Sequence, residues 1–174
     1  MIDLHLHTHY SDGTFTPEEV VRRAKAAGLS TISLTDHDTI AGLPAARQAA
    51  GADLEVLSGV ELTVVFRDRE LHLLGYGFRE TDPALARYLG RAQANRHRRI
   101  QEMLDRLRER GIEIALEEVQ AVAGEGHSIG RPHLAEVLVK RGKVGSLNEA
   151  FDRYIGDRAP CFVKRATLSV AEAT

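Results

Sequence analysis

The chain has 174 residues, a formal net charge of −2 and a single cysteine, Cys161. This length fits one domain, or one domain with an insertion. A single cysteine excludes a disulfide framework within the chain and favours a reducing, cytoplasmic location. The near-balanced charge gives the chain no general attraction to nucleic acid or membrane, and no stretch approaches the roughly 18 apolar residues of a membrane span.

Strand and helix patterns alternate over the first eighty residues. Short apolar or alternating runs predict strands at residues 2–7, 31–35, 54–60 and 70–76. Thr16, Pro17 and Glu19 form the start signal of a helix that ends at Gly28, and a second helix begins near Gly42. This alternation predicts an α/β fold with a mostly parallel sheet.

The pattern becomes helical at Asp82-Pro83. A long helix is predicted to about residue 110, followed by shorter helices at 116–123, 132–141 and 147–154. Residues 161–164 then resemble a returning strand, and Ser169 is a candidate cap for a further helix. We therefore expect a core made of residues 1–81 and 159–174, interrupted by an all-helical insertion subdomain of residues 82–158.

Each of the four predicted strands brings a histidine or an acid to a position at or near its end. His5 and His7 alternate on one face of the first strand, where two imidazoles can chelate one metal ion. Asp12 follows in a Ser-Asp-Gly turn, and His37 lies between Asp36 and Asp38 after the second strand. Glu61 ends the third predicted strand and His72 lies in the fourth. Because active sites of parallel α/β folds gather at strand ends, these residues predict a shared metal site.

Each residue also has an ordinary structural interpretation. Asp12 alone is more often a turn residue that bonds its own backbone, and a lone histidine such as His72 in an apolar strand is more often part of the core. His9 continues the alternation but lies beside the turn, so we do not expect it to be a ligand. The coincidence of such residues at four successive strands favours the metal site over these alternatives.

Five segments together resemble the polymerase and histidinol phosphatase (PHP) family. They are Asp-Leu-His-Leu-His-Thr at 3–8, Ser-Asp-Gly at 11–13, Leu-Thr-Asp-His-Asp at 34–38, Gly-Val-Glu at 59–61 and His-Leu-Leu-Gly-Tyr at 72–76. The resemblance implies a distorted seven-stranded α/β barrel, of which this chain holds a part. It also implies two or three divalent ions, with Mn²⁺ favoured and Fe²⁺ or Zn²⁺ as alternatives. The implied metal ligands are His5, His7, Asp12, His37, Glu61 and His72, with Glu61 bridging two ions.

The helical region sharpens the resemblance. Gly130-Arg131-Pro132-His133 looks like a segment of the PHP branch that hydrolyses nucleoside 3′,5′-bisphosphates and degrades RNA. The resemblance implies that Arg131 and His133 bind the substrate phosphate and that His37, Glu61 and His133 are catalytic. The other interpretation of Arg131 is a solvated arginine at a helix start. The arginines of the long helix are also more typical of a solvated face than of a cationic track for an oligonucleotide; they are Arg87, Arg91, Arg96, Arg98, Arg99, Arg106, Arg108 and Arg110.

The expected function is hydrolysis of nucleotide phosphate esters, with a nucleotide or short oligonucleotide as the substrate and no stable protein partner. Family members carry three further ligands in a His-Pro and an Asp-x-His motif, which this sequence lacks, so we interpret the chain as the N-terminal part of such a protein. Three alternatives stay open: another PHP phosphatase of the histidinol phosphate type, a metal-dependent amidohydrolase, and a non-catalytic metal- or nucleotide-binding module. The amidohydrolase fits less well because the chain offers no candidate for its usual bridging lysine.

Overall fold

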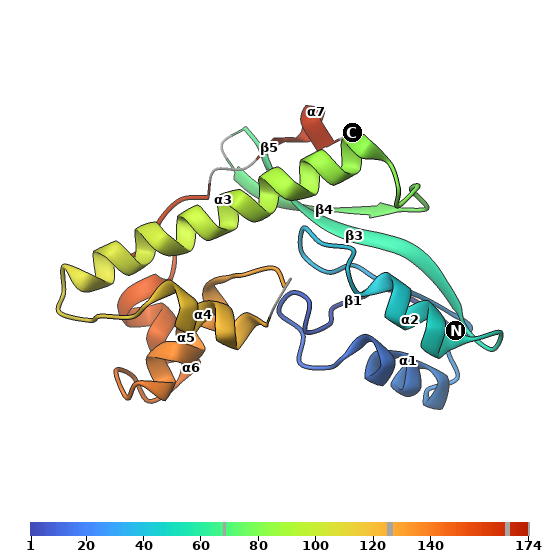
Figure 1. Cartoon of the computed structure of the whole chain (residues 1–174), viewed down its shortest axis with the longest axis horizontal. Coiled ribbons are helices and arrows are strands. Elements are labelled where there is room, and N and C mark those ends of the chain that lie inside the picture. The colour runs from blue at the N-terminus through green and yellow to red at the C-terminus, as the bar shows by residue number, and fades with distance from the viewer. Residues whose placement is uncertain (68, 125–126, 166–167, 174) are drawn as a thin grey trace. The chain divides into compact units, whose positions relative to one another are not determined.

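The computed structural model describes residues 1–67, 69–124, 127–165 and 168–173 (Figure 1). Two compact units divide the chain, and each is described by itself. The first comprises Met1–Ala92, Gly126–Ser128 and Thr167–Thr174, and the second comprises Gln93–Glu125 and Ile129–Ala166. The division therefore falls inside the long helix, after Ala92. Residues 166, 167 and 174 of the predicted core segment lie outside the described residues.

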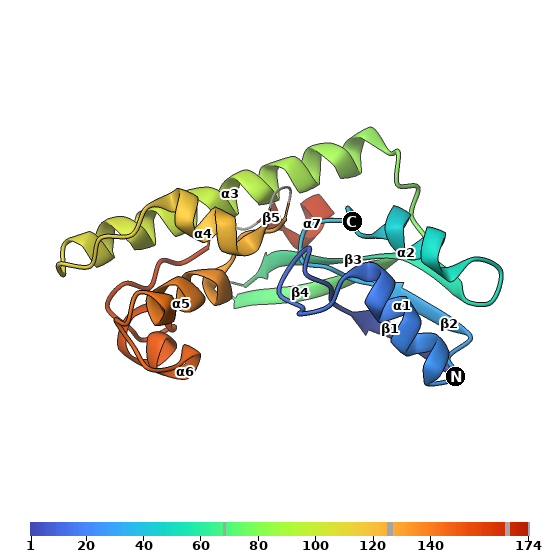
Figure 2. The same ribbon diagram turned by 60° about the horizontal axis from the view of Figure 1, so that its bottom comes forward.

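The first unit contains a sheet whose strands run in the order β1 (Ile2–Leu6), β2 (Thr31–Leu34), β3 (Glu55–Phe66) and β4 (Arg69–Tyr76). The pairs β1–β2 and β2–β3 are parallel, as is the pairing of β3 with the short strand β5 (Leu168–Ser169). The predicted α/β class is confirmed. β4 runs antiparallel to β3 as a hairpin, because the connection is far shorter than the dozen or more residues that a parallel crossover needs. Figure 2 shows β3 and β4 as a long adjacent pair.

The sheet curls so that its outer strands approach one another. β1 and β4 are the two ends of the strand order, and in a flat sheet three strand spacings would hold them about 14 Å apart. The hydroxyl of Tyr76 on β4 nevertheless donates a hydrogen bond of 2.8 Å to the carbonyl oxygen of Leu4 on β1. The curl therefore forms a concave inner side, toward which strand residues on one face can converge.

Two helices of the first unit lie side by side and pack against the sheet (Figure 1). α1 (Pro17–Ala26) begins as predicted, because the Thr16 side chain accepts a hydrogen bond from the Glu19 amide. α2 (Leu43–Ala50) follows Gly42, also as predicted. Their apolar faces share one core with the sheet, made of Val20, Val21, Ala24, Ile32, Leu34, Leu43, Ala46, Ala50 and Leu54.

The alternation of side chains along β3 separates an apolar face from a polar one. Val60, Leu62 and Val64 pack with Tyr88 and Ala92 from the start of α3 (Pro83–Arg108). Successive strand residues point to opposite faces. The intervening Glu61 and Thr63 therefore lie on the face away from this apolar cluster, although both are buried.

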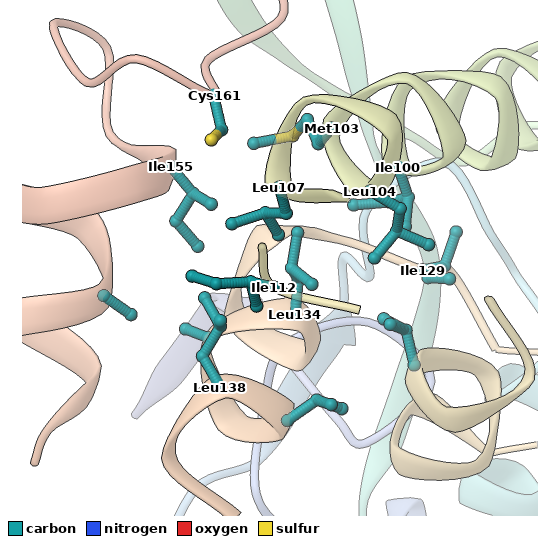
Figure 3. Packing of buried hydrophobic residues seen from close by; sticks show 14 of the residues in the cluster. Ile100, Met103, Leu104, Leu107, Ile112, Ile129, Leu134, Leu138, Ile155 and Cys161 are labelled. Atoms are coloured by element: carbon teal, nitrogen blue, oxygen red, sulfur yellow. The ribbon is translucent and has the colours of Figure 1, made fainter. Parts of the chain in front are cut away.

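The second unit is helical and has its own core (Figure 3). It contains the rest of α3, then α4 (Leu116–Ala123), α5 (Arg131–Lys140), α6 (Leu147–Ala150) and the π-helical turn η1 (Phe151–Ile155). Its buried apolar residues include Ile100, Met103, Leu104, Leu107, Ile112, Ile129, Leu134, Leu138, Ile155 and Cys161. The last element of the chain, α7 (Val170–Ala173), belongs to the first unit. Among the described residues, no helix combines the length and apolar character that a membrane crossing needs.

One sequence expectation is wrong in the second unit, and a second fails at two residues. Residues 161–164 form no strand. Instead, the backbone oxygens of Phe162 and Val163 accept hydrogen bonds from the side chains of Arg106 and Arg99. Arg99 is consequently buried, and Arg96 is buried where it donates to the Ile129 carbonyl oxygen. The other six arginines named for this helix are exposed, as the predicted solvated face requires. The pattern of charges along a helix does not reveal a neighbouring segment that needs hydrogen-bond donors.

Candidate metal centre

Glu61 lies at the middle of a ring of histidines. It occupies the interior of β3, which continues to Phe66, so the prediction that Glu61 ends its strand is wrong. One of its oxygens, Oε2, lies 3.1 Å from His5 Nε2 and 2.9 Å from His7 Nε2. Both histidines come from the end of β1, as the alternation predicted. The carboxylate is only 3% exposed as a residue, so its charge is balanced by these imidazoles rather than by solvent.

His37 reaches the same carboxylate because its backbone extends β2 alongside β3. His37 and Glu61 form an isolated parallel bridge, and the amide of Asp38 donates a 2.9 Å hydrogen bond to the Glu61 carbonyl oxygen. This pairing brings His37 Nδ1 to 3.7 Å from Glu61 Oε2. The same nitrogen is buried and has no hydrogen-bond partner among the described residues.

His72 approaches from the hairpin partner β4. Leu74 pairs directly with Glu61 in the ladder and Thr63 pairs with His72. His72 is therefore the diagonal neighbour of Glu61 on the same face, a position that longer side chains can bridge. Its Nδ1 lies 2.6 Å from Glu61 Oε1. The antiparallel hairpin thus supplies His72 from within β4, in the fourth strand to which the sequence pattern assigned it.

Asp12 closes the other side of the cluster from the loop after β1. Its two oxygens lie 3.4 Å from His7 Nδ1 and 3.5 Å from His37 Nε2. The hydrogen bond from His37 is the main reason that the pKa of Asp12 falls from 3.8 to about 2. Asp12 is therefore an anionic ligand candidate at neutral pH.

Within the described residues, three groups have donor atoms that lie within 4.8 Å of one another and could each hold a metal ion. The groups share members: His7, His37 and Glu61 each belong to two of them. They are His5–His7–Glu61, His7–Asp12–His37 and His37–Glu61–His72. Imidazole nitrogens and carboxylate oxygens suit Zn²⁺, Fe²⁺ and Mn²⁺, and the buried, unpartnered His37 Nδ1 is the kind of atom that a metal would satisfy. The donor set therefore fits more than one divalent ion.

A buried hydrogen-bond network holds the loop that carries these donors. Asp36 accepts hydrogen bonds of 2.7 Å from the Thr8 amide, the Thr8 hydroxyl and the Ser11 hydroxyl. Asp38, whose backbone has the left-handed φ of 53°, accepts from the amide and hydroxyl of Thr63. Thr8 and Ser11 were not singled out from the sequence, although they lie inside the Asp-Leu-His-Leu-His-Thr and Ser-Asp-Gly segments. They connect the end of β1 to Asp12.

The electrostatics of the centre make metal binding dependent on pH. Burial would raise the pKa of Glu61, but hydrogen bonds from His7 and His72 outweigh it and keep the pKa well below its usual range. The hydrogen bond to Glu61 raises the pKa of His72 from 6.5 to about 9. In metal-free protein His72 is therefore protonated at pH 7.5, and it must lose that proton to act as a ligand.

We therefore expect manganese binding at pH 7.5 to release about one proton or more per chain, and the apparent affinity to rise with pH up to about 9. Titration calorimetry in buffers of different ionisation enthalpy measures the release directly. A binding heat that is independent of the buffer would contradict this expectation.

Gly13 allows the loop to fold back on β1. A Cβ atom at this position would lie 2.4 Å from the backbone oxygen of His7. Gly13→Ala should therefore push the Asp12 loop away and weaken manganese binding by about 10-fold or more, as displaced supporting residues do at metal sites. Gly90→Ala is the matched control, because a Cβ at Gly90 in α3 meets nothing within 4 Å and alanine favours the helix. Equal manganese affinities for the two variants would refute the role of Gly13.

Arg131 and His133 belong to the second unit, where each has a hydrogen bond to another part of that unit or to its own helix start. Arg131 donates hydrogen bonds to the Ile155 carbonyl oxygen and, at 2.7 Å, to the carboxylate of Asp157. His133 Nδ1 accepts a 3.1 Å hydrogen bond from the Gly130 amide at the start of α5. Arg131 is thus not simply a solvated helix-start residue, and both side chains have structural contacts of their own.

The fold and the site define a class of protein: an α/β sheet that gathers histidines and carboxylates around a shared glutamate. The PHP domain family model matches residues 3–155. This chain belongs to the PHP domain family.

Individual relatives match nearly the whole chain. It is 40% identical to a 5′-3′ exoribonuclease of Haemophilus influenzae over 98% of this chain and 62% of that protein. It is 34% identical to a 3′,5′-nucleoside bisphosphate phosphatase of Chromobacterium violaceum over 99% of this chain and 61% of that protein. A solved structure from Bifidobacterium adolescentis, described as a metal-dependent phosphoesterase, has a TM-score of 0.90 at 32% identity and covers 99% of this chain and 61% of that one. The chain thus spans about three fifths of the length of the relatives it matches.

Proposed function

We propose that this chain is part of a metal-dependent phosphoesterase that acts on nucleotides. The proposed reaction is removal of the 3′-phosphate from nucleoside 3′,5′-bisphosphates, 5′-3′ exonucleolytic cleavage of short RNA, or both. The observation that carries the proposal is the position of Glu61, whose buried carboxylate is shared by four histidines. The activities in the names of two relatives support the choice of substrate.

The proposed metal ligands are the six residues that converge in the first unit. They are His5, His7, Asp12, His37, Glu61 and His72. Two or three divalent ions, with Mn²⁺ as our choice, would share Glu61 as the bridging ligand. When bound, such ions lower the pKa of a coordinated water and neutralise charge on a phosphoryl group.

The protein's own residues supply position and orientation. Glu61 holds His7 and His72 by hydrogen bonds, and the backbone bridge at His37 keeps its ring against the same carboxylate. Asp36 and Asp38 act as positioning residues, because they fix the backbone on either side of His37 through Thr8, Ser11 and Thr63. Such supporting contacts keep donor atoms in place before a ligand arrives.

Arg131 and His133 are proposed to bind substrate phosphate, with His133 also catalytic, and this part of the proposal rests on their motif. A guanidinium presents paired N–H donors that match phosphate geometry. To bind phosphate, Arg131 would break its ion pair with the exposed carboxylate of Asp157 and form one with the phosphate instead. The inserted helical subdomain and the partial seven-stranded barrel remain part of the same proposal, as does the cytoplasmic location suggested by the single cysteine.

The experiment is phosphate release from 3′-phosphoadenosine 5′-phosphate by manganese-loaded protein. His37→Ala should lower the rate by about 100-fold or more, because His37 belongs to two of the three groups of side chains that could each hold a metal ion. His97→Ala is the matched control, since His97 lies in α3 of the second unit and its Nδ1 bonds the Gln93 carbonyl oxygen one turn earlier in the same helix. Undiminished turnover by the His37 variant would contradict the proposal, and metal binding without any turnover would favour a binding module.

A further inference from the structure

Three aromatic rings gather at the loop that follows His7 in the first unit. We call His9, Tyr10 and His127 the ring cluster. The centroids of His9 and Tyr10 are 4.8 Å apart with planes inclined by 25°, and the His127 centroid lies 4.6 Å from His9 and 4.5 Å from Tyr10. All three residues are partly exposed. The rings therefore form a small aromatic surface that solvent, and hence a ligand, can reach.

The backbone holds the ring cluster together from two distant segments. The amide of Ser128 donates a 2.8 Å hydrogen bond to the carbonyl oxygen of Tyr10, which fixes His127 against the loop after β1. The amide of His9 donates a 2.9 Å bond to the Phe15 carbonyl oxygen and closes that loop. The arrangement is thus pre-formed and does not depend on a chance contact between mobile side chains.

Two polar atoms of this region are buried without a partner. Among the described residues, neither His9 Nδ1 nor Ser128 Oγ has a hydrogen bond, and Ser128 is fully buried. Buried polar groups are nearly always hydrogen-bonded, so an unsatisfied one calls for an explanation such as a ligand. Ser128 follows His127 in the chain and is fully buried, so His9 Nδ1, which belongs to a partly exposed residue of the ring cluster, is the atom that a ligand there would satisfy.

We infer that the ring cluster is a nucleobase-binding subsite, an inference that rests on the proposed function and specifies its substrate. Bases stack on tyrosine and histidine rings, and an imidazole nitrogen such as His9 Nδ1 can hydrogen-bond the polar edge of a base. A phosphate would instead call for cationic side chains. His9 follows His7 by two residues, so their Cα atoms are at most about 7 Å apart. A phosphate at the metal centre would therefore place a base, one sugar away, within reach of the ring cluster.

The first test uses unmodified protein and adenosine, which has a base and no phosphate. EDTA is present, so that metal binding plays no part. Adenosine should bind, and intermolecular nuclear Overhauser effects should connect its base protons with the Tyr10 ring. Ribose should not bind under the same conditions. The absence of adenosine binding, or contacts to other residues only, would overturn the inference.

The second test compares variants by adenosine affinity. Tyr10→Ala and His127→Ala should each weaken binding by roughly 5- to 100-fold, the range found when a stacking ring is removed. Tyr10→Phe keeps the ring and should bind within about 2-fold of the parent. Phe66→Ala is the matched control, because it removes an exposed aromatic ring that lies at the end of β3 and does not belong to the ring cluster. Unchanged adenosine affinity in both alanine variants would refute the subsite.

The result of the adenosine-binding tests can be distinguished from the result of the phosphate-release experiment that tests the proposed function. Adenosine binding in EDTA requires neither metal nor turnover, so it can succeed where phosphate release fails. The opposite outcome is also possible: the protein fails to bind adenosine and releases phosphate from a base-free sugar phosphate as fast as from 3′-phosphoadenosine 5′-phosphate. That result would support the phosphoesterase and rule out the nucleobase subsite.

Discussion

Glu61→Gln is expected to lower manganese affinity by at least about 100-fold, more than the loss of a supporting residue causes. The amide keeps the shape of the side chain but removes the negative charge and one acceptor oxygen. Both oxygens of Glu61 face histidines, and two of the three candidate metal groups contain this residue. Metal content after dialysis and calorimetric titration with Mn²⁺ measure the effect.

Glu55→Gln is the control for this change. Glu55 lies at the start of the same strand, is exposed, and bonds the Thr31 hydroxyl away from the centre. Its replacement should leave manganese affinity within about 2-fold, as expected of a surface residue. If Glu61→Gln retained the affinity of the Glu55 variant, the bridging role of Glu61 would be excluded.

The same substitution should change the pH dependence of stability in metal-free protein. The pKa of Glu61 is lowered in the folded state, so its charge stabilises the fold above the ordinary value of 4.5 and this stabilisation is lost as the pH falls. The pKa of His72 is raised, so its contribution is present below 6.5 and is lost as the pH rises through about 9. Glu61→Gln should remove the first contribution and reduce the second, because Glu61 is the main cause of the raised pKa of His72 and Glu70 is the next.

Much of the first unit could be predicted from local signals. The cap at Thr16 and the helix start after Gly42 depend on residues next to one another in sequence, and both are confirmed. The end of β3 could not be read in this way. The sequence prediction ended this strand at Glu61, whereas β3 continues to Phe66, and Gly59 lies inside β3, where a Cβ would come within 2.0 Å of the Ser33 hydroxyl. A glycine required by close strand packing and one required by a turn look alike in sequence.

The convergence of the six candidate ligands was predictable because strand alternation and parallel pairing place them on one face. Their mutual distances now support that geometry, while their role as ligands remains a prediction. The residues that hold them were less accessible to sequence reasoning. Thr8 and Ser11 donate to Asp36, which lies 28 and 25 positions away along the chain. Nothing in the local pattern distinguishes such a hydroxyl from an ordinary loop residue.

Asp36→Ala is expected to destabilise metal-free protein by about 3 kcal/mol. Asp36 is 2% exposed and accepts three hydrogen bonds, from the Thr8 amide and the hydroxyls of Thr8 and Ser11. Its removal leaves these buried donors unsatisfied, and each unsatisfied donor costs about 1–3 kcal/mol, although the costs are not additive. Urea unfolding in the presence of EDTA, with the slope checked for two-state behaviour, measures the loss.

The same variant should also bind manganese about 10- to 100-fold more weakly, because Thr8 and Ser11 lie between His7 and Asp12 in the loop that Asp36 fixes. Asp53→Ala is the control: its side chain is 85% exposed and pairs with Lys25 at 3.7 Å, a contact worth less than about 1 kcal/mol. Asp36→Asn keeps one acceptor oxygen and should fall between the two. If Asp36→Ala unfolded at the same urea concentration as the parent, the network would have no structural role, and the rigidity of the Asp12 loop would need another source.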